Sequence, residues 1–182
     1  MPGTVVIVQT EENRMLCVIA KLAPDVNEKL SRLRQTAMPQ VHFSSPLYAH
    51  ITLATYLPED TEAFITACRK MLRDAHSFSV RYEKLEVLSE TSILVAVPAS
   101  SEPLSSLHNR IEMAFGEHLD RWTRGETWYP HTTLLCDPAA DLNTLCNEMR
   151  KHFAPFEAHI EQIEFSRVEE NGYTIVESVR LL

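Results

Sequence analysis

The sequence predicts a single α+β domain built from two related lobes. Three observations support this: strands and helices alternate along the chain, the order of elements in the first half recurs in the second, and no Pro-, Gly- or Ser-rich linker separates the halves. We therefore expect one domain over 1–182, with 1–90 and 91–182 as its approximate halves.

Eight short segments carry the pattern of β-strands. They are apolar runs rich in β-branched residues, or runs in which apolar and polar residues alternate. The predicted strands are 4–9, 15–22, 50–56, 78–82, 92–97, 131–136, 156–160 and 173–181.

Four helices are predicted between these strands. They cover 25–38, about 60–75, 104–115 and 137–149. The first begins at Asp25, with Glu28 three residues on as in a capping box. The fourth begins at Asp137 and Pro138, because aspartate caps a helix and proline suits its first turn.

The composition is that of a folded domain, with 45% hydrophobic and 23% charged residues in a chain of 182. No apolar run approaches the roughly 20 residues that span a bilayer, so no membrane association is expected. The N-terminal segment lacks the basic and apolar regions of a secretion signal, and the four cysteines lie far apart. We therefore expect a cytoplasmic protein with reduced thiols.

The formal net charge of −8 bears on the class of ligand. A negative overall field repels long polyanions, which disfavours binding to long DNA or RNA. A small phosphate ligand stays compatible with this charge, because one pocket can be positive on an acidic protein.

One hexapeptide recurs at equivalent places in the two halves. YAHITL (48–53) and YPHTTL (129–134) share Tyr, His, Thr and Leu, and each opens a predicted strand. The stretch His42-Phe43-Ser44 fits the His-x-Ser/Thr pattern loosely, but it has no apolar strand behind it and is assigned to a loop.

The spacing gives the repeat a chemical meaning. Side chains at i and i+2 of a strand share a face, so Thr52 lies beside His50 and Thr133 beside His131. If the halves pack with an approximate twofold, the two pairs face each other across a groove. One neutral and one protonated imidazole then suit the cleavage of a phosphodiester, while the hydroxyls donate to phosphate oxygens.

The paired His-x-Thr motifs, their placement and the chain length resemble the 2H phosphoesterase superfamily, which includes 2′-5′ RNA ligase-like proteins and cyclic nucleotide phosphodiesterases. The resemblance implies two lobes of antiparallel sheet flanked by helices, with a central cleft. It implies that His50 and His131 are catalytic, that Thr52 and Thr133 bind phosphate, and that no metal or other cofactor is required. The implied substrates are 2′,3′-cyclic phosphates, 2′-5′ linkages and related esters of small nucleotides or RNA ends.

Aromatic residues near the motifs are candidate substrate-binding groups. Tyr48 and Tyr129 precede each His by two residues, and either hydrogen-bond phosphate, stack on a base, or simply open the strand. Trp128 has a similar status, with base stacking and core packing both open. The same two interpretations apply to a further group: Phe43 in the loop 39–49, Arg121, Trp122 and Arg124.

Several alternatives stay open. The two histidines are also metal ligands in principle, although only Asp137 is near enough in sequence to suggest a third. The main hypothesis is hydrolysis by a monomer, and the others are RNA end-joining through the same histidines or a non-catalytic nucleotide-binding module. The remaining histidines are assigned surface or structural roles: His76, His108, His118, His152 and His159.

Overall fold

The structure is a computed structural model that describes residues 15–37, 48–57, 60–169 and 172–182. Within these ranges the strands form one antiparallel seven-stranded sheet. The strands are β1 (Leu16–Leu22), β2 (His50–Tyr56), β3 (Phe78–Val87), β4 (Ile93–Pro98), β5 (Thr132–Cys136), β6 (Phe156–Glu169) and β7 (Gly172–Arg180). The strand predicted at 4–9 lies outside the described residues.

The long strand β6 joins the two parts of the sheet. Its N-terminal part, from Phe156, pairs with β3, and the part that follows pairs with β1 and β7. The hydrogen-bonded order is β2-β1-β6-β3-β4-β5, so β2 and β5 are its two ends. The antiparallel α+β architecture expected from the sequence is confirmed, with the strands of both halves joined into one sheet.

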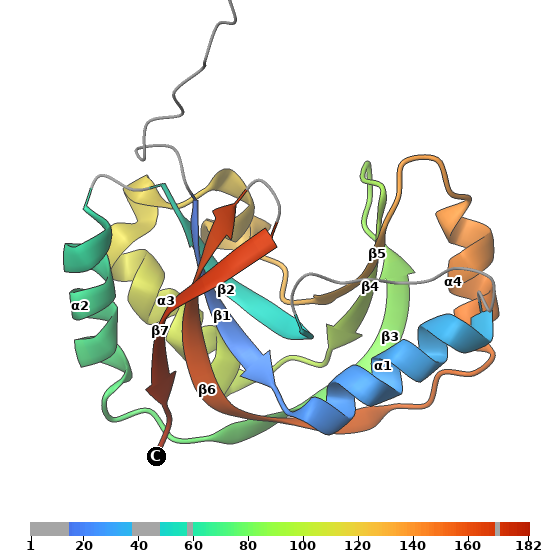
Figure 1. The fold of residues 1–182 in the computed structure, drawn as a ribbon, viewed down its shortest axis with the longest axis horizontal. Coiled ribbons are helices and arrows are strands. Elements are labelled where there is room, and N and C mark those ends of the chain that lie inside the picture. The colour runs from blue at the N-terminus through green and yellow to red at the C-terminus, as the bar shows by residue number, and fades with distance from the viewer. Residues whose placement is uncertain (1–14, 38–47, 58–59, 170–171) are drawn as a thin grey trace, which may run out of the picture.

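In the described ranges four α-helices flank the sheet: α1 (Pro24–Ala37), α2 (Thr61–Leu72), α3 (Glu102–Phe115) and α4 (Leu142–Arg150). Helix α1, from the first half of the chain, packs with α4 from the second, and α2 packs with α3. Figure 1 shows α2 and α3 on the side of β1 and β2, and α1 and α4 on the side of β3. Each of the two helix pairs therefore combines one helix from the first half of the sequence with one from the second.

The helix starts follow local capping, with one correction. Asp60, Ser101 and Asp141 each accept a hydrogen bond from a backbone N–H in the first turn of α2, α3 and α4. The helix predicted from Asp137 was therefore placed too early. The Asp137 carboxylate accepts from the backbone N–H of Ala139 at 2.8 Å, which closes a turn before the helix begins.

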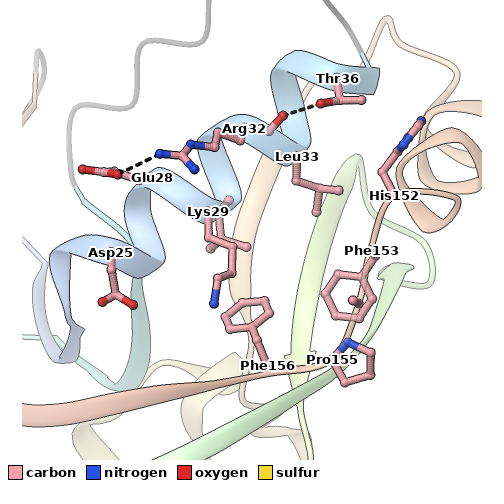
Figure 2. A pocket seen from close by; sticks show the side chains of 12 residues that line it. Asp25, Glu28, Lys29, Arg32, Leu33, Thr36, His152, Phe153, Pro155 and Phe156 are labelled. Atoms are coloured by element: carbon pink, nitrogen blue, oxygen red, sulfur yellow. Dashed lines mark hydrogen bonds and ion pairs between the residues drawn. The ribbon is translucent and has the colours of Figure 1, made fainter.

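The apolar core fills the space between the sheet and its helices, and its largest fully buried side chains include Tyr82, Phe64 and Phe165. No helix of the described residues is long and apolar enough to cross a membrane. Outside the core, a cavity of about 550 Å³ lies between α1 and residues 152–156. There Lys29 Nζ lies 4.4 Å from the centroid of the Phe156 ring (Figure 2).

Candidate active site

The first His-x-Thr motif opens β2. Ile51 and Leu53 are fully buried in the core, whereas His50 and Thr52 are half-buried on the opposite face. This alternation follows from the two-residue period of a strand, and it directs the imidazole and the hydroxyl to the same side.

The second motif opens β5, where His131 immediately precedes the first strand residue. Thr132 is buried, whereas Thr133 is exposed. The Thr132 hydroxyl donates to the His50 carbonyl at 2.9 Å, and the buried Tyr82 hydroxyl bonds to Thr132 in turn. Because Thr132 uses its proton on His50, Tyr82 is the donor to Thr132. This chain of hydrogen bonds holds the two ends of the sheet side by side, so the predicted motifs are brought together.

Both imidazoles are fixed in the same way. His50 Nδ1 lies 2.9 Å from the Tyr48 carbonyl, and His131 Nδ1 lies 2.7 Å from the Tyr129 carbonyl. Since a carbonyl only accepts, each Nδ1 carries a hydrogen. In the part of the chain that the structure describes, neither Nε2 has a hydrogen-bond partner. Each ring therefore keeps Nε2 for proton transfer, as a base when neutral and as an acid when charged.

The surroundings lower the pKa of both histidines, but to different extents. Burial, followed by the charge of His131, lowers the pKa of His50 from 6.5 to about 4. Burial also lowers the pKa of His131, but the hydrogen bond to the Tyr129 carbonyl and the nearby Glu86 carboxylate oppose this change. The two motifs lie near each other in space, because Thr132, the residue after His131, donates to the His50 carbonyl at 2.9 Å.

A cavity of about 590 Å³ opens beside the motifs; His50 and Thr52 of the first motif and Thr132 and Thr133 of the second line it, but His131 does not. Its walls come from β1, β2, β5 and α1, with contributions from the ends of β6 and β7. The residues that line it include Cys17, Arg34, Tyr48, His50, Thr52, Thr55, Thr132, Thr133, Cys136 and Tyr173. Such a volume suits a ligand larger than phosphate alone.

The two motif tyrosines occupy different places. Tyr48 lines the cavity, and Lys21 Nζ lies 4.6 Å from the centroid of its ring. Tyr129 is 39% exposed and its hydroxyl donates to Glu86, outside the residues that line this cavity. Of the two, only Tyr48 is placed to contact a ligand in the cavity, and a substrate-binding role for either stays a prediction.

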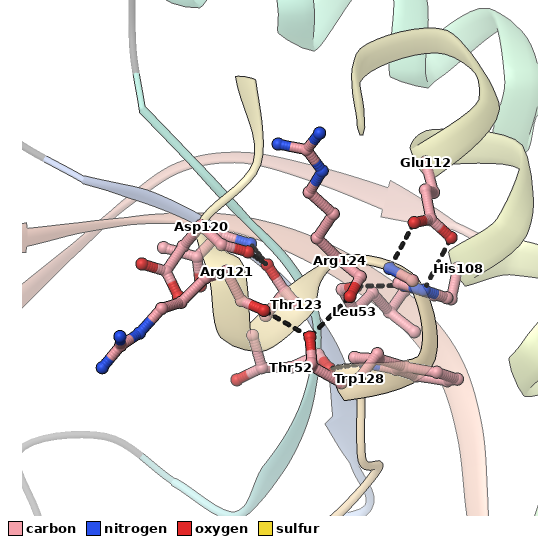
Figure 3. Close-up of polar contacts among 12 residues, drawn as sticks. Thr52, Leu53, His108, Glu112, Asp120, Arg121, Thr123, Arg124 and Trp128 are labelled. Atoms are coloured by element: carbon pink, nitrogen blue, oxygen red, sulfur yellow. Dashed lines mark hydrogen bonds and ion pairs between the residues drawn. The ribbon is translucent and has the colours of Figure 1, made fainter. Parts of the chain in front are cut away.

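Trp128 supports the wall of the site from behind. Its indole N–H donates to the Thr52 carbonyl at 3.0 Å, and its ring stacks on His108 with centroids 3.9 Å apart. His108 Nδ1 lies 2.8 Å from the Leu53 carbonyl, and its Nε2 lies 3.4 Å from Glu112 (Figure 3). The indole N–H and one ring face of Trp128 are thus engaged with the protein, and a substrate-binding role for this residue stays a prediction.

The loop that carries Trp128 is fixed by Gly125. This residue has a left-handed φ of 57°, and its backbone N–H donates to Glu112. Trp122 and the neighbouring Arg121 lie in the same loop, where the guanidinium covers the Trp122 ring at 4.4 Å and the ring stays 59% exposed. Neither residue lines the cavity of the motifs.

Sequence reasoning missed two charged residues of the site. Glu86 is a partly buried residue of β3, and nothing in the local sequence pattern distinguishes it from other carboxylates. Arg34 comes from α1, and its position four residues after the buried Leu30 was the available signal, since i and i+4 share a helix face. Among the described residues no group of three His, Cys, Asp or Glu side chains is arranged to hold a metal ion.

Comparisons with known proteins identify the family and the fold. The 2′-5′ RNA ligase superfamily matches the chain over residues 22–172. Similar solved structures include E. coli LigT complexed with 3′-AMP, at 14% identity and a TM-score of 0.69, covering 93% of this chain and 98% of that one. Another is TT0787 of Thermus thermophilus, at 17% identity and a TM-score of 0.65, covering 92% and 97%.

A third is Kluyveromyces marxianus Usb1 with uridine monophosphate, at 11% identity and a TM-score of 0.50, covering 91% and 98%. No curated protein sequence matches. At these identities the solved structures support the fold, and the family match extends over most of the chain. The protein therefore belongs to the 2′-5′ RNA ligase superfamily, among the 2H phosphoesterases.

Proposed function

We propose that this protein is a metal-independent phosphodiesterase that cleaves a 2′,3′-cyclic phosphate or a 2′-5′ linkage of a small nucleotide or RNA end. The observation that carries the proposal is the matched fixing of two neighbouring imidazoles, each held through Nδ1 with Nε2 left for proton transfer. The complexes of E. coli LigT with 3′-AMP and of Usb1 with uridine monophosphate support a nucleotide as the ligand class.

In the proposed reaction His50 is the base. With a pKa lowered to about 4, its Nε2 is neutral near pH 7 and accepts a proton from water. The water oxygen attacks phosphorus, and the bond to one ribose oxygen breaks. His131 then donates its Nε2 proton to that oxygen, which leaves a nucleotide with one phosphate and one hydroxyl.

The assignment of His131 as the acid follows from its neighbours. The Glu86 carboxylate and the Tyr129 carbonyl both favour its protonated form, whereas no carboxylate among the described residues raises the pKa of His50. A bound phosphodiester adds one negative charge, which raises the pKa of both rings and favours protonation of the more basic one. Thr52 and Thr133 donate to the non-bridging phosphate oxygens as negative charge moves onto them.

The test is turnover on a panel of 2′,3′-cyclic nucleotides and 2′-5′ oligoadenylates between pH 3 and 9, with and without excess EDTA; the range includes the pKa of about 4 of His50. The expected result is turnover that EDTA does not change, with a bell-shaped pH profile. His50→Ala and His131→Ala should each lose most of the rate, and the double variant should be scarcely slower, because the two act as a unit. The control is His159→Ala, since His159 is an exposed residue of β6 bonded to Ser79.

Two outcomes would contradict the proposal. Loss of activity to EDTA with recovery on adding zinc or manganese would indicate metal catalysis by the same residues. Nucleotide binding without turnover on any substrate would indicate a binding module. The assignment of roles has its own check: Glu86→Gln should move the alkaline limb of kcat/KM to lower pH, because the His131 imidazolium loses its nearby carboxylate.

A further inference from the structure

The cavity at the motifs differs from the rest of the protein in charge. The chain as a whole carries −8, yet the described residues that line the cavity include no carboxylate. Apart from His50, they include one cationic side chain, that of Arg34. Among the described residues, an anion in this cavity therefore meets a single permanent positive charge on its walls.

Arg34 is held against the second motif. It lies in the last turn of α1, where Nη2 donates to Ser31 Oγ at 3.0 Å. Nη1 donates at 3.3 Å to the carbonyl of Leu134, the residue that follows Thr133. The guanidinium is thus fixed beside the strand that presents the Thr133 hydroxyl to the cavity.

The surroundings of Arg34 strengthen its attraction for an anion. The side chain is partly withdrawn from water, and burial lowers the pKa of its guanidinium. A cation in such surroundings attracts an anion more strongly than an exposed one, because water screens the pair less. The planar guanidinium also presents several N–H donors in one plane, which suits the oxygens of a phosphate.

We infer that Arg34 is the anion-binding residue of the site, which holds the phosphoryl group of the ligand on the Thr133 side of the cavity. This inference rests on the proposed function for its substrate, and it adds the group that selects a phosphorylated ligand over a neutral one. The neighbouring arginine of the same helix does not share the role. Arg32 is exposed, lines the other cavity and pairs with Glu28 at 3.2 Å (Figure 2).

The experiment measures binding of inorganic phosphate, 3′-AMP and adenosine by calorimetry to the wild-type chain and to Arg34→Gln, Arg34→Lys and Arg32→Gln. Arg34→Gln should weaken the binding of phosphate and 3′-AMP by roughly 10- to 100-fold, the usual effect of losing a charged hydrogen bond, and leave the binding of adenosine unchanged. It should also reduce the dependence of 3′-AMP binding on salt. The affinity of Arg34→Lys for phosphate and 3′-AMP should lie between those of the wild type and Arg34→Gln, because lysine keeps the charge but lacks the planar set of N–H donors. The affinities of Arg32→Gln should match those of the wild type.

Three results would overturn the inference. The first is phosphate binding by Arg34→Gln as tight as that of the wild type, and the second is no phosphate binding by the wild type. The third is an equal loss of affinity for adenosine and 3′-AMP in both Arg34 variants, which would mean that the residue only supports the wall through Leu134 and Ser31. Binding is measured without turnover, so a chain that binds phosphate through Arg34 and cleaves nothing would refute the proposed function alone.

Discussion

Replacing Thr132 by valine tests how the two motifs are held together. Valine keeps the shape and strand preference of threonine and removes the hydroxyl, which donates to the His50 carbonyl at 2.9 Å and accepts from Tyr82. The buried Tyr82 hydroxyl and the partly buried His50 carbonyl then lose a partner. Burial raises the pKa of Tyr82, so its hydroxyl stays protonated and needs an acceptor. At about 1–2 kcal/mol for each orphaned group, unfolding should become easier by roughly 2–4 kcal/mol.

The neighbouring threonine is the matched control. Thr133 is exposed and no described residue hydrogen-bonds to its side chain, so Thr133→Val should change the free energy of unfolding by less than about 0.5 kcal/mol. Its turnover should nevertheless fall by about ten- to a thousand-fold, because the lost hydroxyl is the proposed donor to phosphate. Thr132→Val should lose both stability and turnover, since it loosens the spacing of the imidazoles.

Urea denaturation of the two single variants, of Tyr82→Phe and of the double variant Tyr82→Phe/Thr132→Val separates the contributions. Removing the Tyr82 hydroxyl beforehand leaves only the His50 carbonyl orphaned, so the double variant should be more stable than the sum of the singles predicts by about 1 kcal/mol. The reasoning fails if Thr132→Val is as stable as the wild type, or if the two threonine variants lose equal stability.

Two further predictions concern the same region. Because the pKa of His50 is lowered from 6.5 to about 4, the unfolded chain takes up a proton in that window before the folded chain does. The free energy of unfolding should therefore be highest above pH 6.5 and fall by up to about 3 kcal/mol toward pH 4. Urea denaturation at each pH measures this fall, which should be smaller in His50→Gln. Trp128→Phe keeps the stack on His108 but deletes the hydrogen bond to the Thr52 carbonyl, so it should lower stability by about 1 kcal/mol and leave affinity for 3′-AMP unchanged. A large loss of affinity for 3′-AMP at unchanged stability would instead support the predicted contact of Trp128 with the substrate.

The strands that were predicted too short are those in which polar residues interrupt the apolar alternation. The predicted strand 156–160 continues to Glu169 in the structure, past Glu164, which is only 2% exposed. Its carboxylate is buried because Lys21 Nζ lies 3.0 Å away and Gln162 also donates to it. A carboxylate at an inward position contradicts the pattern of a strand until its partner on β1 is known.

A second strand was predicted too short for a geometric reason. β3 was expected to end near Tyr82 but runs to Val87, and its pairing with β4 shifts register between Tyr82 and Lys84. The extra residue places two exposed side chains in succession before the buried Leu85, which breaks the two-residue period. Periodicity therefore predicts the first part of β3 but not its continuation after Tyr82, which carries Glu86.

The same limit explains which parts of the site were predictable. The His-x-Thr pairs are local and repeated, so two matching copies marked the groups proposed to act on a substrate. The residues that set the charge of these imidazoles are not repeated in the two halves of the chain. Glu86 favours the protonated form of His131, and no carboxylate among the described residues does so for His50. Arg34 donates to a carbonyl of the second motif, that of Leu134.

A catalyst with one base and one acid needs such asymmetry. Two imidazoles in equivalent surroundings have the same intrinsic pKa and share a proton equally, so half of the singly protonated molecules hold it on the wrong ring. Residues present beside only one motif remove this equivalence, at positions where a search for repeats finds nothing. The duplicated fold thus supplies two matched imidazoles, and we infer that the unmatched Glu86 assigns the proton to His131.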